Sequence, residues 1–291
     1  MVSTVGDGFE EYLRRLAPLD TEMRAAQAHY KSVESSLRNN LPGAKLIPTG
    51  SFGNGTALKR YSDADYFVII PRGLVGTDSA DVLQRVRATL KGTFPRTGVA
   101  VRTPAVIVPF GIGGSESIDV VPALSVAKTS QGHAIYDIPD RGGHWMRSSP
   151  VAHKAYVTAL DNAHAHRVKR LVMLVKAWKA YWNVPMLSFY LEMRVARYAE
   201  TVKTIDYGRG IEMVLGSMVG PSGLATLRDP MEIAGSIRPC TTAAQEKQAL
   251  TKVRRGLTRV REARRREASG NVEKAFERWN LFFNSSFPAY K

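Results

Sequence analysis

Two aspartates one residue apart, Asp63 and Asp65, stand at the start of an apolar run in this 291-residue sequence. The stretch around them, residues 49–70, reads TGSFGNGTALKRYSDADYFVII. Side chains alternate along a strand, so residues two apart project from the same face. Two ionised carboxylates that close repel each other unless a cation lies between them. The pair therefore predicts a site for a hard divalent ion, with Mg²⁺ the default where phosphates supply further ligands.

A third acid, Asp119, lies in the short apolar stretch 118–121, where a lone buried carboxylate would be costly. If this stretch pairs beside residues 63–70, all three acids meet at adjacent strand ends. Three carboxylates there would hold two Mg²⁺ ions, with Mn²⁺ as the alternative. One ion would lower the pKa of an attacking hydroxyl, and the other would stabilise leaving pyrophosphate oxygens. An Asp-x-Asp pair alone also caps turns, and for the pair by itself that interpretation stays open.

A glycine-rich stretch precedes the acids: Gly50-Ser51, then Gly53, then Gly55-Thr56. Its backbone N–H groups and hydroxyls would lie in a loop that can approach anions closely, which suits a triphosphate. This is not a Walker loop, because no Gly-Lys-Ser/Thr follows and we expect no helix to open directly from it.

Hydrophobic periodicity and breaker residues predict the elements that position these residues. In the first half they form a small mixed sheet backed by helices, and Asp20 is expected as a helix N-cap. From Pro150 onward the sequence is helical. Expected helices span 9–16, 21–39, 79–91, 167–182, 188–203, 242–268 and 271 to about 284; expected strands span 45–49, 63–70, 99–110 and 117–121.

The composition is strongly basic. Lys and Arg number 41 against 26 Asp and Glu, for a net charge of +15. The excess predicts a polyanionic ligand such as nucleotides, nucleic acid or an acidic surface, although a functionally silent basic surface stays open. The basic run 252–266 is either a nucleic-acid-binding face or a solvated helix face whose inward residues are Val253, Leu257 and Val260.

Bulk features also indicate the compartment. Cys240 is the single cysteine, so there is no disulfide framework, as is typical of reducing cytosol. The N-terminus has no secretory apolar region, and the apolar runs are too short to span a bilayer. We therefore expect a cytoplasmic protein with no membrane partner.

Gly50-Ser51, Asp63-Ala64-Asp65 and Asp119 together resemble the nucleotidyltransferase superfamily that includes DNA polymerase beta and poly(A) polymerase. The closer resemblance is to bacterial cyclic-oligonucleotide synthases, the CD-NTases, which are relatives of cyclic GMP-AMP synthase and oligoadenylate synthase. A long helix before the Gly-Ser strand fits that family's spine helix. The other stretches that carry the resemblance are ESIDVVPAL, a lid-like YDIPDRGGHWMRSSP at 136–150, and KAWKAYWNVPMLSFYLE at 176–192.

The resemblance implies an α/β (α+β) bilobal nucleotidyltransferase fold. Residues 1–150 would form the catalytic core, with a mixed β-sheet and the N-terminal spine helix. Residues 151–291 would form a helical C-terminal lobe that closes the active-site cleft.

The resemblance also implies roles for single residues. Asp63, Asp65 and Asp119 would be the catalytic metal ligands, and Asp119 would help to activate the acceptor hydroxyl. Lys176 and Ser188 would bind phosphate and Phe189 would stack on a base, although Lys176 is otherwise a solvated residue, Ser188 an N-cap and Phe189 a core residue. The full nucleotide-binding set is Gly50, Ser51, Thr56, Lys176, Ser188 and Phe189.

By this resemblance the chain is an Mg²⁺-dependent synthase that joins nucleoside triphosphates, ATP or GTP or both, into a cyclic di- or trinucleotide and releases pyrophosphate. A separate effector would sense the product in bacterial anti-phage signalling. No obligatory nucleic-acid activator is expected, because the zinc-binding insertion of animal cyclic GMP-AMP synthase is missing. Two alternatives stay open: a non-cyclising nucleotidyltransferase of the oligoadenylate or RNA-tailing type, and a catalytically silent basic nucleic-acid-binding protein.

Overall fold

The computed structural model describes residues 2–60 and 63–291, and the chain divides into two compact units. One unit is Pro18–Lys154, and the other joins the N-terminal residues through Ala17 to Ala155–Lys291. The chain passes from one unit to the other after Ala17 and after Lys154, so the first 17 residues group with the C-terminal residues. The physical reason is aromatic packing, since Phe9 lies 4.9 Å from the Trp279 ring.

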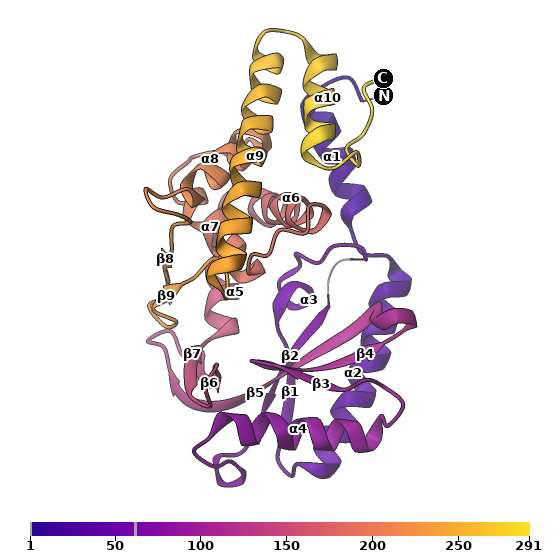
Figure 1. Ribbon diagram of the computed structural model, residues 1–291, viewed down its shortest axis with the longest axis vertical. Helices are drawn as coiled ribbons and strands as arrows, with labels where there is room; N and C mark the ends of the chain where they lie inside the picture. The colour runs from indigo at the N-terminus through magenta and orange to yellow at the C-terminus, as the bar shows by residue number, and fades with distance from the viewer. Residues whose placement is uncertain (1, 61–62) are drawn as a thin grey trace. The chain divides into compact units, whose positions relative to one another are not determined.

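The unit Pro18–Lys154 is built on a mixed sheet (Figure 1). Within its described residues the sheet has seven strands: five pair in the order β1-β2-β5-β4-β3, and β6 pairs with β5 and β7 with β6. β2 and β5 run parallel, and the other pairs are antiparallel. The strands are β1 Lys45–Pro48, β2 Ala64–Ile69, β3 Ala100–Arg102, β4 Ala105–Phe110, β5 Glu116–Lys128, β6 Ala134–Pro139 and β7 Trp145–Ser148.

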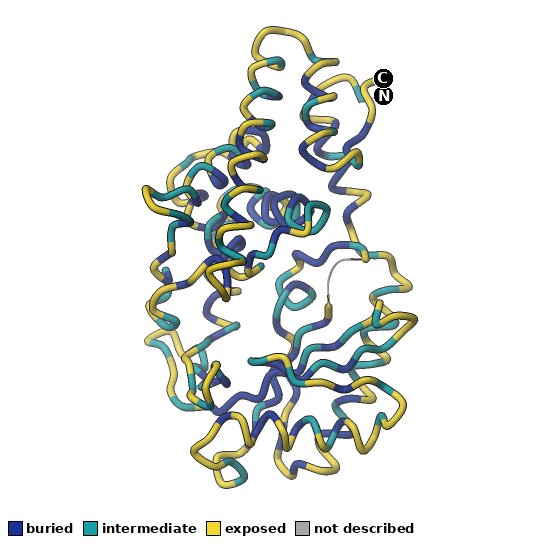
Figure 2. The backbone as a smooth tube through the Cα atoms, viewed as in Figure 1, coloured by how far each residue is buried: buried dark blue, intermediate teal, exposed yellow. Residues whose placement is uncertain are grey.

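Two helices cover one face of this sheet, α2 (Asp20–Asn40) and α4 (Ser79–Thr93). Their apolar stripes, including Val33 and Val86, join the inward residues of β2, β4 and β5 in one buried core. Figure 2 shows the outward sides of these helices exposed and the middle of the sheet buried. The prediction that Asp20 caps α2 is wrong. The N-cap is Leu19, whose N–H donates to the Glu22 carboxylate at 2.8 Å, so the helix starts one residue earlier.

Three expected elements differ in the structure. The run 99–110 splits into β3 and β4, and the strand expected at 117–121 continues to Lys128. The lid-like segment 136–150 is largely the β6–β7 hairpin, because Gly142 and Gly143 have positive φ and allow the chain to turn back. Short 3₁₀ turns at Arg72–Leu74 and Ile112–Gly114 complete this unit.

The other compact unit is helical. An aromatic core holds it together, with Trp178, Trp279 and Phe282 each almost fully buried. Its helices are α1 Val5–Leu16, α6 Arg167–Tyr181, α7 Ser188–Ala199, α8 Tyr207–Met218, α9 Ala243–Ala268 and α10 Val272–Phe282; α5 Pro150–Ala163 contains the unit boundary, and β8 Leu227–Arg228 pairs with β9 Ser236–Ile237.

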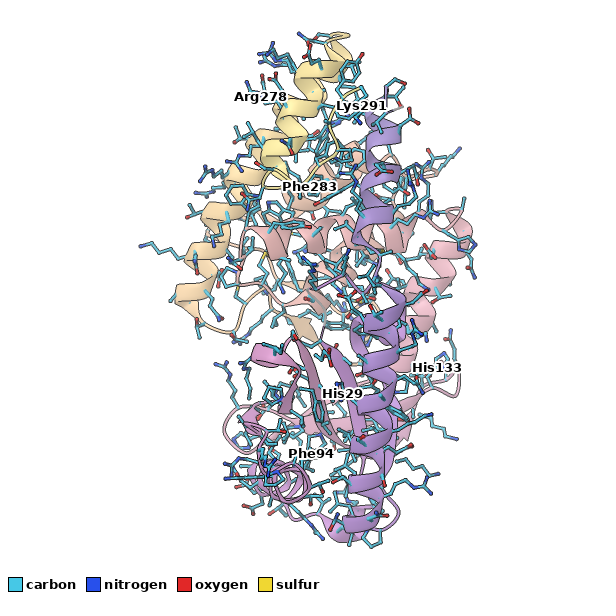
Figure 3. All side chains as sticks on the ribbon, turned by 90° about the vertical axis from the view of Figure 1, so that its right-hand side faces the viewer. His29, Phe94, His133, Arg278, Phe283 and Lys291 are labelled. Carbon is cyan, nitrogen blue, oxygen red and sulfur yellow. The ribbon has the colours of Figure 1, made fainter. Side chains whose placement is uncertain are left out.

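The chain ends meet in this aromatic core. Tyr12 of α1 lies 4.6 Å from the Phe283 ring and shares a 2.8 Å hydrogen bond with the Ser286 hydroxyl. Lys291 N–H donates to the Val2 carbonyl at 3.1 Å. Figure 3 marks Phe283 and Lys291 in this region. These contacts explain why the N-terminal helix belongs to the C-terminal unit.

Helix α9 buries the side that its periodicity predicts. Val253, Leu257 and Val260 are all buried, so the inward stripe is confirmed. No helix among the described residues has the length and apolar composition that crossing a membrane requires.

Candidate active site

Asp65 and Asp119 stand side by side on the two parallel strands. The β2–β5 register pairs them directly, so both side chains project from the same face. Their neighbours Ala64 and Ile118 face the opposite way, into the core under α2 and α4. The two carboxylates therefore emerge on the face that these helices leave uncovered.

Asp63 lies just outside the strand. β2 begins at Ala64, one residue later than expected, and Asp63 is exposed. Its charge nevertheless reaches Asp119. Burial first, then Asp65 and then Asp63, raise the pKa of Asp119 to about 7, whereas Arg102 acts to lower it. The three acids are thus electrostatically coupled, as their types and spacing predict.

Arg102 is a site residue that the sequence reasoning missed. It ends β3 and pairs with Ala105, while Ile107 on β4 pairs with Asp119. Paired residues share a face, and so do residues two apart, which places Arg102 on the same face as the acids. Strand alternation through residues 100–110 was the signal that could have found it.

The glycine-rich turn is built directly against Asp65. Gly50 has φ +56°, and a Cβ added there would collide with Asp65 Oδ2 and lie 2.6 Å from Asp65 Cβ. The Thr49 N–H also donates to the Asp65 carbonyl at 2.8 Å. Only glycine allows this approach together with this φ. The Gly50 turn and the Asp65 side chain therefore fix each other's position.

The expectation of an open loop at residues 50–56 is wrong, because a short helix, α3 (Gly50–Asn54), begins at Gly50. The Gly53 N–H donates to the Thr49 carbonyl at 3.1 Å, which forms the first backbone bond of the turn. Gly55, at φ +72°, ends the helix in the left-handed conformation. The N–H groups of Gly50 and Ser51 precede the first of these bonds and have no acceptor within the turn.

Ser51 and Thr56 both support this turn. Ser51 is 9% exposed, and its carbonyl accepts from the Thr56 N–H at 2.9 Å. Thr56 is fully buried. The turn is therefore a compact, capped structure in which Ser51 keeps a small exposed surface beside Gly50.

The donor set suits a hard cation. Carboxylate oxygens are the ligands that Mg²⁺ prefers. A positive ion between carboxylates also reduces the repulsion that raises their pKa. Within residues 2–60 and 63–291, no three His, Cys, Asp or Glu side chains are already gathered as a metal cage. What the chain presents is the in-register pair Asp65 and Asp119, with Asp63 on the segment that leads into β2.

The remaining predicted site residues lie in the other compact unit. Lys176 is buried on α6, so its interpretation as a solvated residue is wrong. Ser188 is the first residue of α7 rather than its N-cap, which is Leu187, and its hydroxyl accepts from Lys179 Nζ at 3.1 Å. Phe189 is 37% exposed, so it is not a core residue. The alternative interpretations fail for all three, and their nucleotide roles stay predictions.

Known proteins show the same architecture. The Escherichia coli MS115-1 CdnC structure with ATP superposes with a TM-score of 0.72 at 19% identity, over 98% of this chain and 99% of that chain. The Bradyrhizobium diazoefficiens CD-NTase CdnG in complex with GTP gives 0.71 at 14% identity, over 96% and 97%. Vibrio cholerae DncV, a cyclic AMP-GMP synthase, gives 0.63 at 16% identity, over 98% and 80%. These likenesses show that the expected mixed α/β fold with a helical C-terminal part is correct.

Sequence comparison identifies the family. A curated relative, the cyclic AMP-AMP-AMP synthase of Escherichia coli (strain MS 115-1), is 24% identical over 225 residues, which is 69% of each chain. Residues 3–160, more than half of the chain, match the model of the Second Messenger Oligonucleotide or Dinucleotide Synthetase domain. The chain therefore belongs to this synthetase family and is a nucleotidyltransferase of the bacterial CD-NTase group.

Proposed function

We propose that this chain is a Mg²⁺-dependent synthase that joins nucleoside triphosphates, ATP or GTP or both, into a cyclic di- or trinucleotide. The observation that carries the proposal is the direct pairing of Asp65 with Asp119 beside the Gly50 turn. The relatives support it by their own activities, since one is a cyclic AMP-AMP-AMP synthase and another a cyclic AMP-GMP synthase. Of the similar structures, that of CdnC contains ATP and that of CdnG contains GTP.

Asp63, Asp65 and Asp119 are the proposed ligands of the divalent cation, two Mg²⁺ ions in full occupancy. Nucleotidyltransferases of this family use divalent metal ions. When bound, the metal lowers the pKa of the attacking hydroxyl and stabilises the leaving pyrophosphate. The chain's contribution is rigidity: the parallel register fixes two carboxylates side by side, and the Gly50 backbone against Asp65 restricts that side chain. Asp119 is also proposed to help activate the acceptor hydroxyl.

Gly50, Ser51 and Thr56 are proposed to form the triphosphate site. The N–H groups of Gly50 and Ser51 point out of the α3 turn rather than into its backbone bonds, which supports anion binding. Thr56, being buried, would contribute by holding the turn through its N–H bond to Ser51.

Lys176, Ser188 and Phe189 are proposed to bind the nucleotide from the C-terminal lobe that the sequence predicts at residues 151–291, and this lobe is proposed to close the active-site cleft. The exposed Phe189 ring offers a surface on which a base can stack. The Lys179–Ser188 hydrogen bond places an ammonium group beside the serine, which favours phosphate there.

The product would act as a signal read by a separate effector in anti-phage defence. A synthase that consumes cellular nucleoside triphosphates is expected in the cytoplasm. We expect synthesis without an obligatory nucleic-acid activator.

The test is a synthesis assay with purified protein, Mg²⁺ and each of the four labelled nucleoside triphosphates, alone and mixed. A phosphatase-resistant product whose mass equals a cyclic di- or trinucleotide supports the proposal. A ladder of phosphatase-sensitive linear products would identify a non-cyclising nucleotidyltransferase instead. Absence of any product with Mg²⁺ or Mn²⁺, alone and with duplex nucleic acid added, would leave the nucleic-acid-binding alternative and contradict the proposal.

A further inference from the structure

The hairpin of α9 and α10 carries an open groove of about 530 Å³. It lies within the helical unit and is separate from the carboxylates described above. Three arginines line it, two from α9 and one from α10 (Arg278 is marked in Figure 3). Its lining residues are Thr258, Arg261, Glu262, Arg265 and Arg278.

Arg278 has an unmet hydrogen-bond requirement. Its Nε atom is buried, and no atom of the described residues accepts a hydrogen bond from it. A guanidinium stays charged at any pH a protein experiences, so it cannot relieve this cost by losing its proton. A buried donor without an acceptor is destabilising, and a shift of the Arg278 side chain that brings this N–H to a ligand in the groove would remove that penalty.

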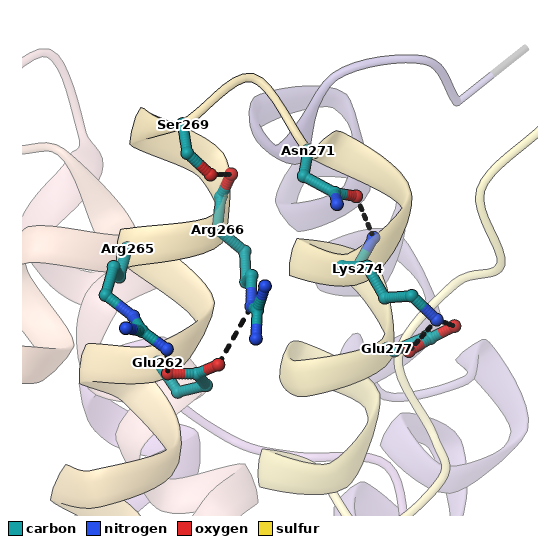
Figure 4. Close-up of polar contacts among 7 residues, drawn as sticks. All are labelled: Glu262, Arg265, Arg266, Ser269, Asn271, Lys274 and Glu277. Atoms are coloured by element: carbon teal, nitrogen blue, oxygen red, sulfur yellow. Dashed lines mark hydrogen bonds and ion pairs between the residues drawn. The ribbon is translucent and has the colours of Figure 1, made fainter.

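Positive charge exceeds negative charge around the groove. Glu262 is already shared, since Arg265 lies 2.6 Å and Arg266 2.8 Å from its two oxygens (Figure 4). Glu212 is shared in the same way, between Arg261 at 3.2 Å and Arg264. Two carboxylates therefore serve four arginines, and Arg278 adds a fifth.

Other arginines of α9 have structural partners on the protein itself. Arg259 donates to the Leu281 carbonyl at 2.8 Å and lies over the Trp182 ring at 4.4 Å. Arg255 lies over the same ring at 5.4 Å. These two guanidiniums hold α9 to its neighbours, whereas the groove arginines compete for shared carboxylates. The basic helix is thus divided into a structural part and a part with spare charge.

We propose that the α9–α10 groove binds a small anion that carries a phosphate chain, of pyrophosphate length or longer. Arg261 and Arg265 are four residues apart on one helix face, and Arg278 reaches the groove from α10. Guanidinium forks match phosphate oxygens in pairs, so three forks suit more than one phosphate group. The groove is open, so its occupant would be held by these guanidiniums rather than enclosed.

A nucleic acid strand is the less favoured polyanion. Binding a single strand generally uses aromatic side chains on which bases stack, and the lining of this groove contains no aromatic residue among the five that form it. Arg255 and Arg259, elsewhere on α9, lie over the Trp182 ring. A compact phosphate chain therefore matches the three groove guanidiniums better than an extended strand does.

The experiment uses the full-length protein in EDTA, so that binding at the metal site is suppressed. Isothermal titration with inorganic tripolyphosphate, pyrophosphate and orthophosphate measures affinity. We expect tripolyphosphate to bind most tightly and to raise the melting temperature. Arg278→Gln and Arg265→Gln should each weaken its binding by about tenfold or more, because a charge-assisted hydrogen bond is lost.

Three further variants make the result specific. Arg254→Gln removes an exposed arginine of α9 outside the groove and should leave the affinity unchanged. Ser51→Ala removes a hydroxyl of the proposed triphosphate site, so it should weaken only binding at that turn, and the binding that Arg278→Gln and Arg265→Gln weaken should persist. If Arg278→Gln fails to fold, Arg261→Gln, at a side chain that is 63% exposed, should weaken binding in a folded protein.

The proposed groove site does not depend on nucleotidyl transfer, so it and the proposed synthase function can fail separately. It is overturned if the groove variants bind tripolyphosphate like the wild type, if Ser51→Ala abolishes binding, or if Arg254→Gln weakens it as much as Arg278→Gln. Binding of duplex DNA but of none of the phosphate chains would also overturn it, in favour of a nucleic-acid face.

Discussion

The carboxylate face of the sheet and the arginine-rich α9–α10 hairpin both gather charges of one sign, but they accommodate them differently. At the sheet, Asp119 is largely buried beside Asp65, which raises its pKa to about 7, and Arg102 acts against that rise. At the hairpin, Glu262 of α9 and Glu212 of α8 are partly exposed, and each pairs with two arginines of α9 that are more exposed than the glutamate.

The difference lies in where the compensating charge comes from. Buried like charges are expensive, so the acid cluster requires a cation that the chain itself does not supply in full. Exposed like charges are screened by water and need less compensation. We therefore propose that the sheet site is organised around a cation, whereas Arg255 and Arg259 of the hairpin serve structure and the groove carries more arginines than carboxylates.

The largest expected effect is at the acid cluster. Asp119→Asn should lower nucleotidyl transfer by about 10²- to 10³-fold or more, because it removes a group that stabilises charge in the transition state. The free energy of unfolding in EDTA should stay the same or rise, because the substitution removes one of three carboxylates that repel each other. The measurements are initial rates with labelled nucleotide and urea unfolding. Asp81→Asn, an exposed position of α4, is the control and should change neither.

The next effect concerns the turn against Asp65. Gly50→Ala should cost about 1–2 kcal/mol of stability from the positive φ, plus about 1–3 kcal/mol from the collision with the Asp65 carboxylate, and should impair activity. Gly55→Ala is the matched control. Gly55 also has a positive φ, +72°, but a Cβ there meets no described atom within 4 Å. Gly55→Ala should therefore lose only the stability that the positive φ costs. Equal losses in the two variants would show that the Gly50–Asp65 contact is unimportant.

A smaller effect tests the structural part of the basic helix. Lys252 Nζ donates to the carbonyls of Trp182 at 2.8 Å and Asn183 at 2.9 Å, just beyond the end of α6. Lys252→Met should therefore lower the free energy of unfolding by about 1–2 kcal/mol, measured by urea denaturation. Lys247→Met, at an exposed position of the same helix, should change it little. If both variants are as stable as the wild type, α9 charges have no structural role.

The smallest effect is electrostatic and depends on pH. Hydrogen bonds from Arg266 and then Arg265 lower the pKa of Glu262 below its usual 4.5. A lowered pKa in the folded state means that the stabilisation is present above pH 4.5 and is lost as pH falls through the lowered value. Glu262→Gln should slightly flatten the acid side of the stability profile, and high salt should erase the difference. A variant profile that is steeper in acid would contradict this contribution.

The sequence predicted the features that repeat along an element. Alternation in residues 63–70 predicted the face from which Asp65 projects, because a strand has a period of two, and the expected pairing with residues 118–121 then predicted Asp119 beside it. The stripe of Val253, Leu257 and Val260 was predicted in the same way from helical periodicity. The pairing of the two strands came from the family resemblance and the cost of a lone buried acid, not from any local signal.

Features that depend on tertiary contact were missed. Glycine-rich residues 50–54 have low helix propensity, yet they form α3 because Thr49 and Gly50 pack on Asp65. Helix α8 contains Gly208, Gly210 and Gly216, which read as breakers. It forms because Ile211 and its apolar neighbours are fully buried, and a Cβ at Gly210 would lie only 2.8 Å from Leu171. Neither reason is visible in residues close in sequence.

The most direct test of the account is whether the acid cluster holds a divalent cation. Mn²⁺ binding can be followed by electron paramagnetic resonance of the free ion, with and without a non-hydrolysable nucleoside triphosphate. We expect the wild type and Asp81→Asn to bind Mn²⁺ alike, and Asp65→Asn and Asp119→Asn each to weaken binding by about tenfold or more. Unchanged Mn²⁺ affinity in Asp119→Asn would contradict it, because the carboxylates paired across β2 and β5 would then not be the metal site.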